Sequence, residues 1–171
     1  MSISDAMPTA PTIRPLRPDE LMAYRAIRLS GLKTSPEAFG SVYEIEAARP
    51  AERYLPRLEA GEVFGAFVDE ALVGIATLSP QDGPKDAHKA GVFGFYVEPG
   101  HRGRGVGAAL MSALITAATG RVEQLTLAVV EDNLPARALY ERFGFTPYGR
   151  EPRALKTANG YADELLMVLF L

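Results

Sequence analysis

The stretch that decides the fold is Val92–Leu110, with the sequence VFGFYVEPGHRGRGVGAAL. Residues 92–97 are β-branched or aromatic apart from one glycine, which predicts a strand that ends at the Pro-Gly pair 99–100. Apolar residues then recur at helical spacing from Val106 and predict a helix to about Ala118. The sequence therefore predicts a strand, a glycine-rich turn and a helix in succession.

The turn favours a phosphorylated ligand. Gly103, Gly105 and Gly107 carry no Cβ, so backbone N–H groups there can approach oxygen atoms closely. The start of the helix adds free N–H groups and the positive end of its dipole, and Arg102 and Arg104 add positive charge. The alternative is a plain surface turn, which rarely needs alternating glycines flanked by arginines.

Two other phosphate-binding motifs fit less well. Gly103, Gly105 and Ala108 match the dinucleotide pattern G-x-G-x-x-A, but too few residues follow for the further strand–helix units of a doubly wound domain. A P-loop needs Gly-Lys-Ser/Thr at the end of the turn, where this chain has Gly105-Val106-Gly107. The ligand is therefore expected to be phosphorylated without being hydrolysed at its phosphates.

A second segment, residues 125–145, has the sequence LTLAVVEDNLPARALYERFGF. It predicts a buried strand followed by a short helix with Asn133 as N-cap and Gly144 at its C-terminal end. Ala136 and Tyr140 lie four residues apart on one face of that helix. This face can point the Tyr140 hydroxyl along the same sheet edge as the glycine turn, although a tyrosine at helical spacing is more often a core residue.

Together these segments resemble the GNAT superfamily of N-acetyltransferases over roughly Thr12–Leu171. The motifs that carry the resemblance are Val97-Glu98-Pro99, Arg102-x-x-Gly105-x-Gly107, Asn133-x-x-Ala136-x-x-x-Tyr140 and Phe143-Gly144-Phe145. The resemblance implies that acetyl-CoA is the acetyl donor, with its pyrophosphate on the turn and its pantetheine arm along the preceding strand. The cofactor-binding residues that it implies are Phe95, Tyr96, Val97, Arg102, Gly103, Arg104, Gly105, Val106, Gly107, Asn133 and Ala136.

The activity implied is direct acetyl transfer to a primary amine of a small molecule or peptide. Tyr140 is the expected catalytic residue, as the general acid that protonates the departing thiolate. A backbone N–H near Tyr96 or Val97 is expected to bond the thioester oxygen. Many relatives carry a glutamate in the signature strand, but residues 92–97 contain none here. Water chains or one of several side chains would then act as the base: Glu44, Glu46, His88, Asp163 or Glu164.

The acceptor is expected to contact the segment Ser35–Gly40, with Glu37, Phe39 and Glu44 as substrate-binding residues. Two other functions stay open. One is a non-catalytic domain that binds acetyl-CoA as a sensor or scaffold, and the other is an acyltransferase that uses a different acyl-CoA. The intact Tyr140 favours an enzyme over a sensor.

Composition is that of an ordinary globular protein. The chain has 171 residues, of which 47% are hydrophobic and 23% charged, and this predicts one domain. The resemblance implies that this is a GNAT domain over residues 12–171, after a flexible N-terminus over residues 1–11. Without cysteine and with only two histidines, no disulfide or metal site is expected. The net charge of −3 argues against nucleic-acid binding. No segment resembles a secretory signal or a membrane span, which predicts a cytoplasmic protein.

The remaining segments predict a mixed α/β fold, with a largely antiparallel twisted sheet of about six to seven strands flanked by about four helices. A first strand covers Ile13–Leu16, and the helix after Pro18 has Leu21, Tyr24, Ile27, Arg28 and Leu32 in register. Further predicted elements are a helical stretch over Tyr43–Glu59 broken near its prolines, a hairpin of Val63–Val68 with Leu72–Ser79, a strand near Pro147 and a last strand over Glu164–Leu171. That last strand is apolar on both faces, which suggests a homodimer if it lies at an edge.

Overall fold

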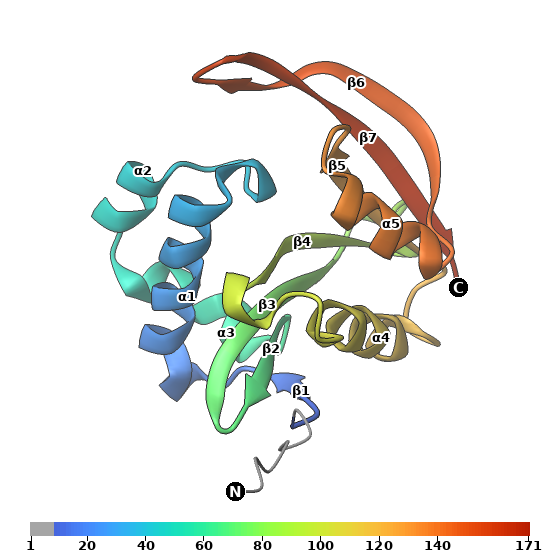
Figure 1. The fold of residues 1–171 in the computed structure, drawn as a ribbon. Coiled ribbons are helices and arrows are strands. Elements are labelled where there is room, and N and C mark those ends of the chain that lie inside the picture. Colours follow the sequence, from blue (N-terminus) through green and yellow to red (C-terminus); the bar gives the residue numbers. More distant parts are fainter. Residues whose placement is uncertain (1–8) are drawn as a thin grey trace, which may run out of the picture.

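A computed structural model describes residues 9–171, which form a seven-stranded sheet with helices on both faces (Figure 1). Residues 1–8 of the predicted flexible N-terminus lie outside the described residues. The strand order is β1-β2-β3-β4-β5-β7-β6, and β4–β5 is the one parallel pair among them. The strands are β1 (Thr12–Pro15), β2 (Val63–Val68), β3 (Ala71–Pro80), β4 (Lys89–Val97), β5 (Gln124–Val130), β6 (Thr146–Thr157) and β7 (Gly160–Phe170).

Each face of the sheet has its own apolar core. The helices are α1 (Leu21–Thr34), α2 (Tyr43–Ala48), α3 (Leu55–Glu59), α4 (Val106–Ala118) and α5 (Leu134–Arg142). Tyr24 of α1 and Leu58 of α3 pack with Ile75 in one core. Leu110 of α4 and Tyr140 of α5 belong to the other. Figure 1 shows α1, α2 and α3 on one side of the molecule and α4 and α5 on the other.

The predicted mixed, mostly antiparallel fold is confirmed, with one difference in the helices. The predicted helical stretch Tyr43–Glu59 is two short helices separated by a 3₁₀ turn that begins after Pro50. Pro56 does not break a helix, because it lies in the first turn of α3, where a missing N–H costs nothing. The chain therefore has five helices in its described part, against about four expected.

The C-terminal strand does not lie at an edge of the sheet. β7 pairs with β5 on one side and with β6 on the other, so its two apolar faces are those of an interior strand. The edge strand next to β7 is β6, which carries Arg150, Glu151, Arg153 and Lys156, and charges of this kind discourage edge-to-edge pairing. The sequence argument for a homodimer was therefore based on a wrong position for this strand.

The two central strands separate. β4 and β5 are paired only from Lys89↔Gln124 to Gly91↔Thr126, although β4 continues to Val97 and β5 to Val130. Beyond that point the facing edges of the two strands have no strand between them. The opening joins the two faces of the sheet.

Candidate functional site

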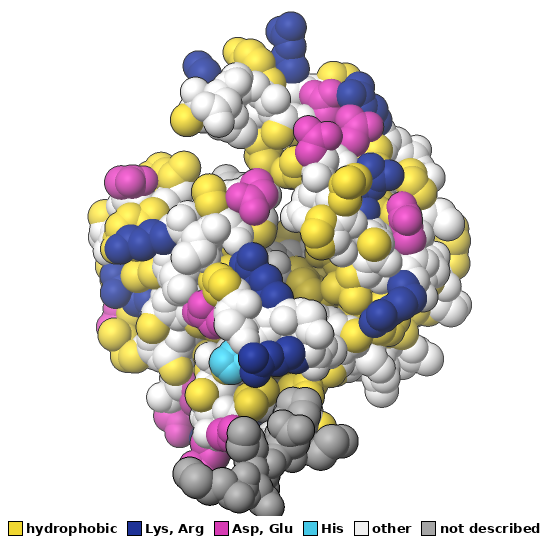
Figure 2. Space-filling view, viewed as in Figure 1, with side chains coloured by type: hydrophobic (Ala, Val, Ile, Leu, Met, Phe, Trp, Pro, Cys, Tyr) yellow, Lys and Arg dark blue, Asp and Glu magenta, His cyan; other side chains and the backbone are white. Residues whose placement is uncertain are grey.

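A cavity of about 710 Å³ occupies the opening between β4 and β5. Arg28 and Phe39 line it on the α1 face, whereas Leu139 and Tyr140 line it on the α5 face. Figure 2 shows the hollow in the middle of the molecule, with hydrophobic side chains inside it and Lys and Arg side chains on its rim. Two molecules that enter from opposite faces would meet in the opening between the strands.

The glycine turn leaves a row of backbone donors free. Gly103 and Gly105 have φ values of +70° and +81°, a region that side chains with a Cβ rarely occupy. Gly105 is the N-cap of α4. In the described part of the chain, the N–H groups of residues 103–108 have no acceptor, and the first helical bond is donated by Ala109 to Gly105. This row suits a diphosphate, as the sequence predicted.

A bulge in β4 lies at the same opening. Phe93 faces Thr77 and Tyr96 faces Ile75, so Gly94 and Phe95 together oppose a single residue of β3. Gly94 has a φ of +56°. A bulge bends its strand and leaves backbone groups outside the ladder, so backbone groups of this part of β4 are available to a ligand in the opening.

Of the predicted cofactor residues on β4, Phe95 and Val97 pack with the α4/α5 core, but Tyr96 faces the other way. The Tyr96 hydroxyl bonds Thr34 at 2.8 Å and donates to Glu98 at 3.1 Å. Its side chain is 2% exposed, so a cofactor would meet mainly its backbone.

Tyr140 lies between two aromatic rings beside the cavity. Its ring meets Phe95 edge-on at 5.8 Å and Phe145 at 6.0 Å, and the residue is 7% exposed. Burial raises the pKa of its phenol, so the group stays protonated near neutral pH and can act as a hydrogen-bond donor. No partner of the hydroxyl is found in residues 9–171.

Asn133 and Ala136 lie where the sequence predicted. The Asn133 Oδ1 accepts from the Ala136 N–H at 3.3 Å and caps α5. Both residues line the cavity; Ala136 lies one helical turn before Tyr140 on α5, and Asn133 is the N-cap of that helix.

The side chains in and next to the arginine-glycine turn differ in where they lie relative to the cavity. Arg102 turns back from the turn: its Nε donates to the Val97 carbonyl at 2.9 Å and its Nη2 to Ser35 Oγ at 2.9 Å. Val106 is buried in the core, so only its backbone is free to meet a ligand. Arg104 is exposed, outside the residues that line the cavity.

The predicted acceptor residues do not all reach the cavity. Glu37 and Phe39 line it, and a Cβ on Gly31 of α1 would lie 2.7 Å from the Phe39 ring, which shows how closely this segment packs. The prediction for Glu44 is not supported, because it lies on the exposed side of α2 and lines a separate shallow pocket.

Of the other candidate bases, Glu164 lines the cavity and the remaining three do not. Glu46 is ion-paired with Arg28, and Asp163 with Arg150. His88 precedes β4 at the paired end of the opening, away from Val97. Glu164 of β7 lines the cavity beside Val130, and burial, with a smaller effect of Glu151, raises its pKa.

Arg28 lines the cavity, although the sequence analysis placed it on the first helix and gave it no role in the site. It occupies the apolar stripe of α1, between Ile27 and Gly31, where a charged side chain has to be buried or paired. That misplaced charge was the signal that could have identified it.

Residues 32–145 match the acetyltransferase (GNAT) family. The chain is 33% identical over 104 residues to the L-amino acid N-acetyltransferase AaaT of Escherichia coli (strain K12), a match that covers 60% of this chain and 64% of that relative.

Two solved structures share the fold. One is a GNAT-family acetyltransferase from Streptococcus pneumoniae, with a TM-score of 0.83 and 21% identity over 95% of this chain and 99% of the other. The second is the phosphinothricin acetyltransferase (Pat) of Sinorhizobium meliloti in complex with AcCoA, with a TM-score of 0.82 and 20% identity over 95% and 89%. The chain belongs to the acetyltransferase (GNAT) family.

Proposed function

We propose that the chain is an N-acetyltransferase that moves the acetyl group of acetyl-CoA directly to a primary amine. The observation that carries the proposal is the opening between β4 and β5, which is lined by Tyr140 and by Gly103 and Gly107 of the turn whose amides, residues 103–108, are free. A ligand with a diphosphate at one end and a thioester at the other suits this arrangement. The name of the E. coli relative, an L-amino acid N-acetyltransferase, supports a small acceptor.

The cofactor half would use mainly backbone. The pyrophosphate would accept from the amides of the turn, and the pantetheine arm would lie along the unpaired edge of β4 as far as Val97. The N–H groups of the bulge at Gly94 and Phe95 would stabilise the negative charge that develops on the thioester oxygen. Asn133 and Ala136 would lie beside the thioester end.

In the transfer step the amine attacks the carbonyl carbon, a C–N bond forms and the C–S bond breaks. Tyr140 would donate its proton, or a hydrogen bond, to the departing thiolate. Glu164 would take the proton from the ammonium, since it faces the cavity without an ion pair in the described residues and its raised pKa makes it a better proton acceptor.

The test is release of free thiol from acetyl-CoA in the presence of a panel of amines, with mass spectrometry of the acetylated products. Acetylated amine confirms the transferase. Tight binding of acetyl-CoA without turnover on any amine would favour the sensor or scaffold instead. Comparison with longer acyl-CoA thioesters would show whether the acetyl group is the preferred cargo.

The assembly and location of the protein stay predictions. No helix in residues 9–171 is long and apolar enough to cross a membrane, and the sequence predicts a cytoplasmic protein. Phe170 and Leu171 are exposed at the end of β7, which is the remaining support for a homodimer. Light scattering tests it: a mass near 18.5 kDa would contradict the dimer, and twice that mass would confirm it.

A further inference from the structure

Arg28 is held in the cavity with one donor nitrogen free. Its side chain is 12% exposed, and its Nε and Nη2 each donate to Glu46 at 2.8 Å. Its Nη1 has no partner in the described residues. A Cβ built on Gly94 would lie 3.3 Å from that nitrogen, so the free donor lies against the β4 bulge, where the acetyl group is proposed to be transferred.

Glu46, the ion-pair partner of Arg28, does not neutralise all the positive charge around it. Glu46 is 2% exposed, and it also accepts from the Tyr54 hydroxyl and lies 3.9 Å from Nη1 of Arg49. The cluster therefore has two guanidinium groups to one carboxylate. The Phe39 ring lies 5.4 Å from the centre of the Arg28 guanidinium and helps to fix its plane.

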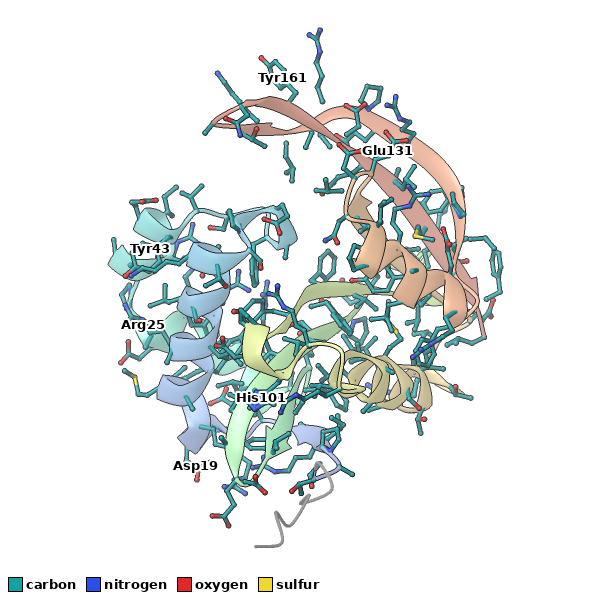
Figure 3. All side chains as sticks on the ribbon, viewed as in Figure 1. Asp19, Arg25, Tyr43, His101, Glu131 and Tyr161 are labelled. Carbon is teal, nitrogen blue, oxygen red and sulfur yellow. The ribbon has the colours of Figure 1, made fainter. Side chains whose placement is uncertain are left out.

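A role in holding helices together does not account for this arrangement. Arg25, on the same helix, already braces α1 to α2 through a bond from its Nη2 to the Ala47 carbonyl at 2.8 Å. It lies on the side of α1 turned away from the cavity (Figure 3). A buried ion pair is weak evidence of stabilisation, because the cost of removing both charges from water offsets most of their attraction. The free nitrogen of Arg28 is explained better by a ligand.

We propose that Arg28 binds a carboxylate of the acceptor, so that the preferred acceptor is a free α-amino acid. In an α-amino acid the carboxylate and the amine are attached to the same carbon. A cation beside the transfer site can therefore bind the carboxylate while the amine attacks the acetyl group. Glu164 lines the same cavity from β7 and would receive the ammonium end. The inference rests on the proposed function and specifies the substrate class of that site.

The experiment compares matched acceptors: free L-amino acids, their C-terminal amides and the corresponding decarboxylated amines. The wild-type protein is expected to prefer the free acid in kcat/KM by about ten- to hundredfold, the usual range for a hydrogen bond to a charged group. Most of the difference should lie in KM. The α-amine of an amino acid amide is less basic than that of the free acid and is more often unprotonated. Intrinsic reactivity would therefore favour the amide over the free acid.

Three variants separate binding from bracing. Arg28→Gln combined with Glu46→Gln removes both buried charges and should abolish the preference while acetylation of the amides continues. Arg25→Gln weakens the same helix contact outside the cavity and should keep the preference. Glu46→Gln alone should keep or increase the preference for the free acid, because the carboxylate that competes for Arg28 is gone. If the pair only held the two helices together, replacing either partner should reduce activity and stability equally.

The outcomes distinguish the inference from the proposed function. If the wild-type protein acetylates amines without preferring the acids, or if the double variant keeps the preference, Arg28 does not bind a carboxylate and only the inference is overturned. If the panel is acetylated by neither protein, both the inference and the proposed function are overturned. Preference for peptides over free amino acids would also overturn the inference.

Discussion

The two halves of the cavity are built differently. The half proposed to bind acetyl-CoA, the cofactor half, is mainly backbone: free amides of residues 103–108, the open edge of β4 and the bulge at Gly94. The half proposed to bind the amine, the acceptor half, is mainly side chains, with Arg28, Phe39 and Glu164 contributed by α1, the segment after it and β7. A backbone site needs only local geometry, so a short motif can specify it, whereas a side-chain site depends on contacts between distant segments.

The largest effect is expected in the acceptor half, from Glu164→Gln. Loss of a general base should lower kcat by about 10²- to 10³-fold with little change in acetyl-CoA affinity. Because burial raises the pKa of Glu164, the wild-type kcat/KM should fall as pH falls through that raised pKa and the carboxylate becomes protonated. The measurement is a pH–rate profile, in which the variant should lack this limb.

Glu151→Gln is the matched control for Glu164. Glu151 faces Glu164 in register on β6, and its charge adds to the raised pKa. Its removal should move the acid limb to lower pH and leave kcat almost unchanged. An unchanged kcat in Glu164→Gln would assign the base to water.

Next in size is Tyr140→Phe, in the cofactor half. The substitution keeps the ring between Phe95 and Phe145 and removes only the hydroxyl. If that hydroxyl serves the leaving thiolate, turnover should fall about 10²-fold while acetyl-CoA affinity stays nearly intact. Steady-state kinetics beside Tyr148→Phe, an exposed tyrosine on β6, checks this; equal turnover would make Tyr140 a packing residue.

Gly105→Val tests the backbone site itself. A β-branched residue is strained at a φ of +81°, so the turn should open and acetyl-CoA should bind at least tenfold more weakly, about 1.4 kcal/mol. Calorimetric titration measures the affinity, and a thermal melt checks that the variant is folded. Gly100→Ala is the control, because Gly100 has free space around its Cβ position and no positive φ. Affinity equal to the control would remove the turn from the binding site.

The same contrast explains what the sequence could predict. The strand, turn and helix around Gly105 and the cap at Asn133 depend on neighbouring residues, and the structure has them where the sequence predicted. The pairing of Arg28 with Glu46 joins residues of α1 and α2 through the packing of the two helices. Glu44 and Glu46 are two residues apart, and only the position of α2 on α1 decides which of them faces inward. The splay between β4 and β5 likewise depends on pairing, which no local pattern specifies.

The smallest expected effect is at Asn133, which belongs to both a helix cap and the cavity. Asn133→Ala removes the acceptor of the Ala136 N–H and should lower the free energy of unfolding by about 1 kcal/mol, seen as a drop in Tm of about 2–4 °C. Asn133→Ser restores a cap but shortens the side chain, so it should recover stability. If Asn133 also contacts acetyl-CoA, both variants should bind the cofactor more weakly, whereas a residue that only caps α5 would show normal affinity in the serine variant. Melting and binding measured on the same pair of variants thus separate the local contribution of this residue from its place in the cavity.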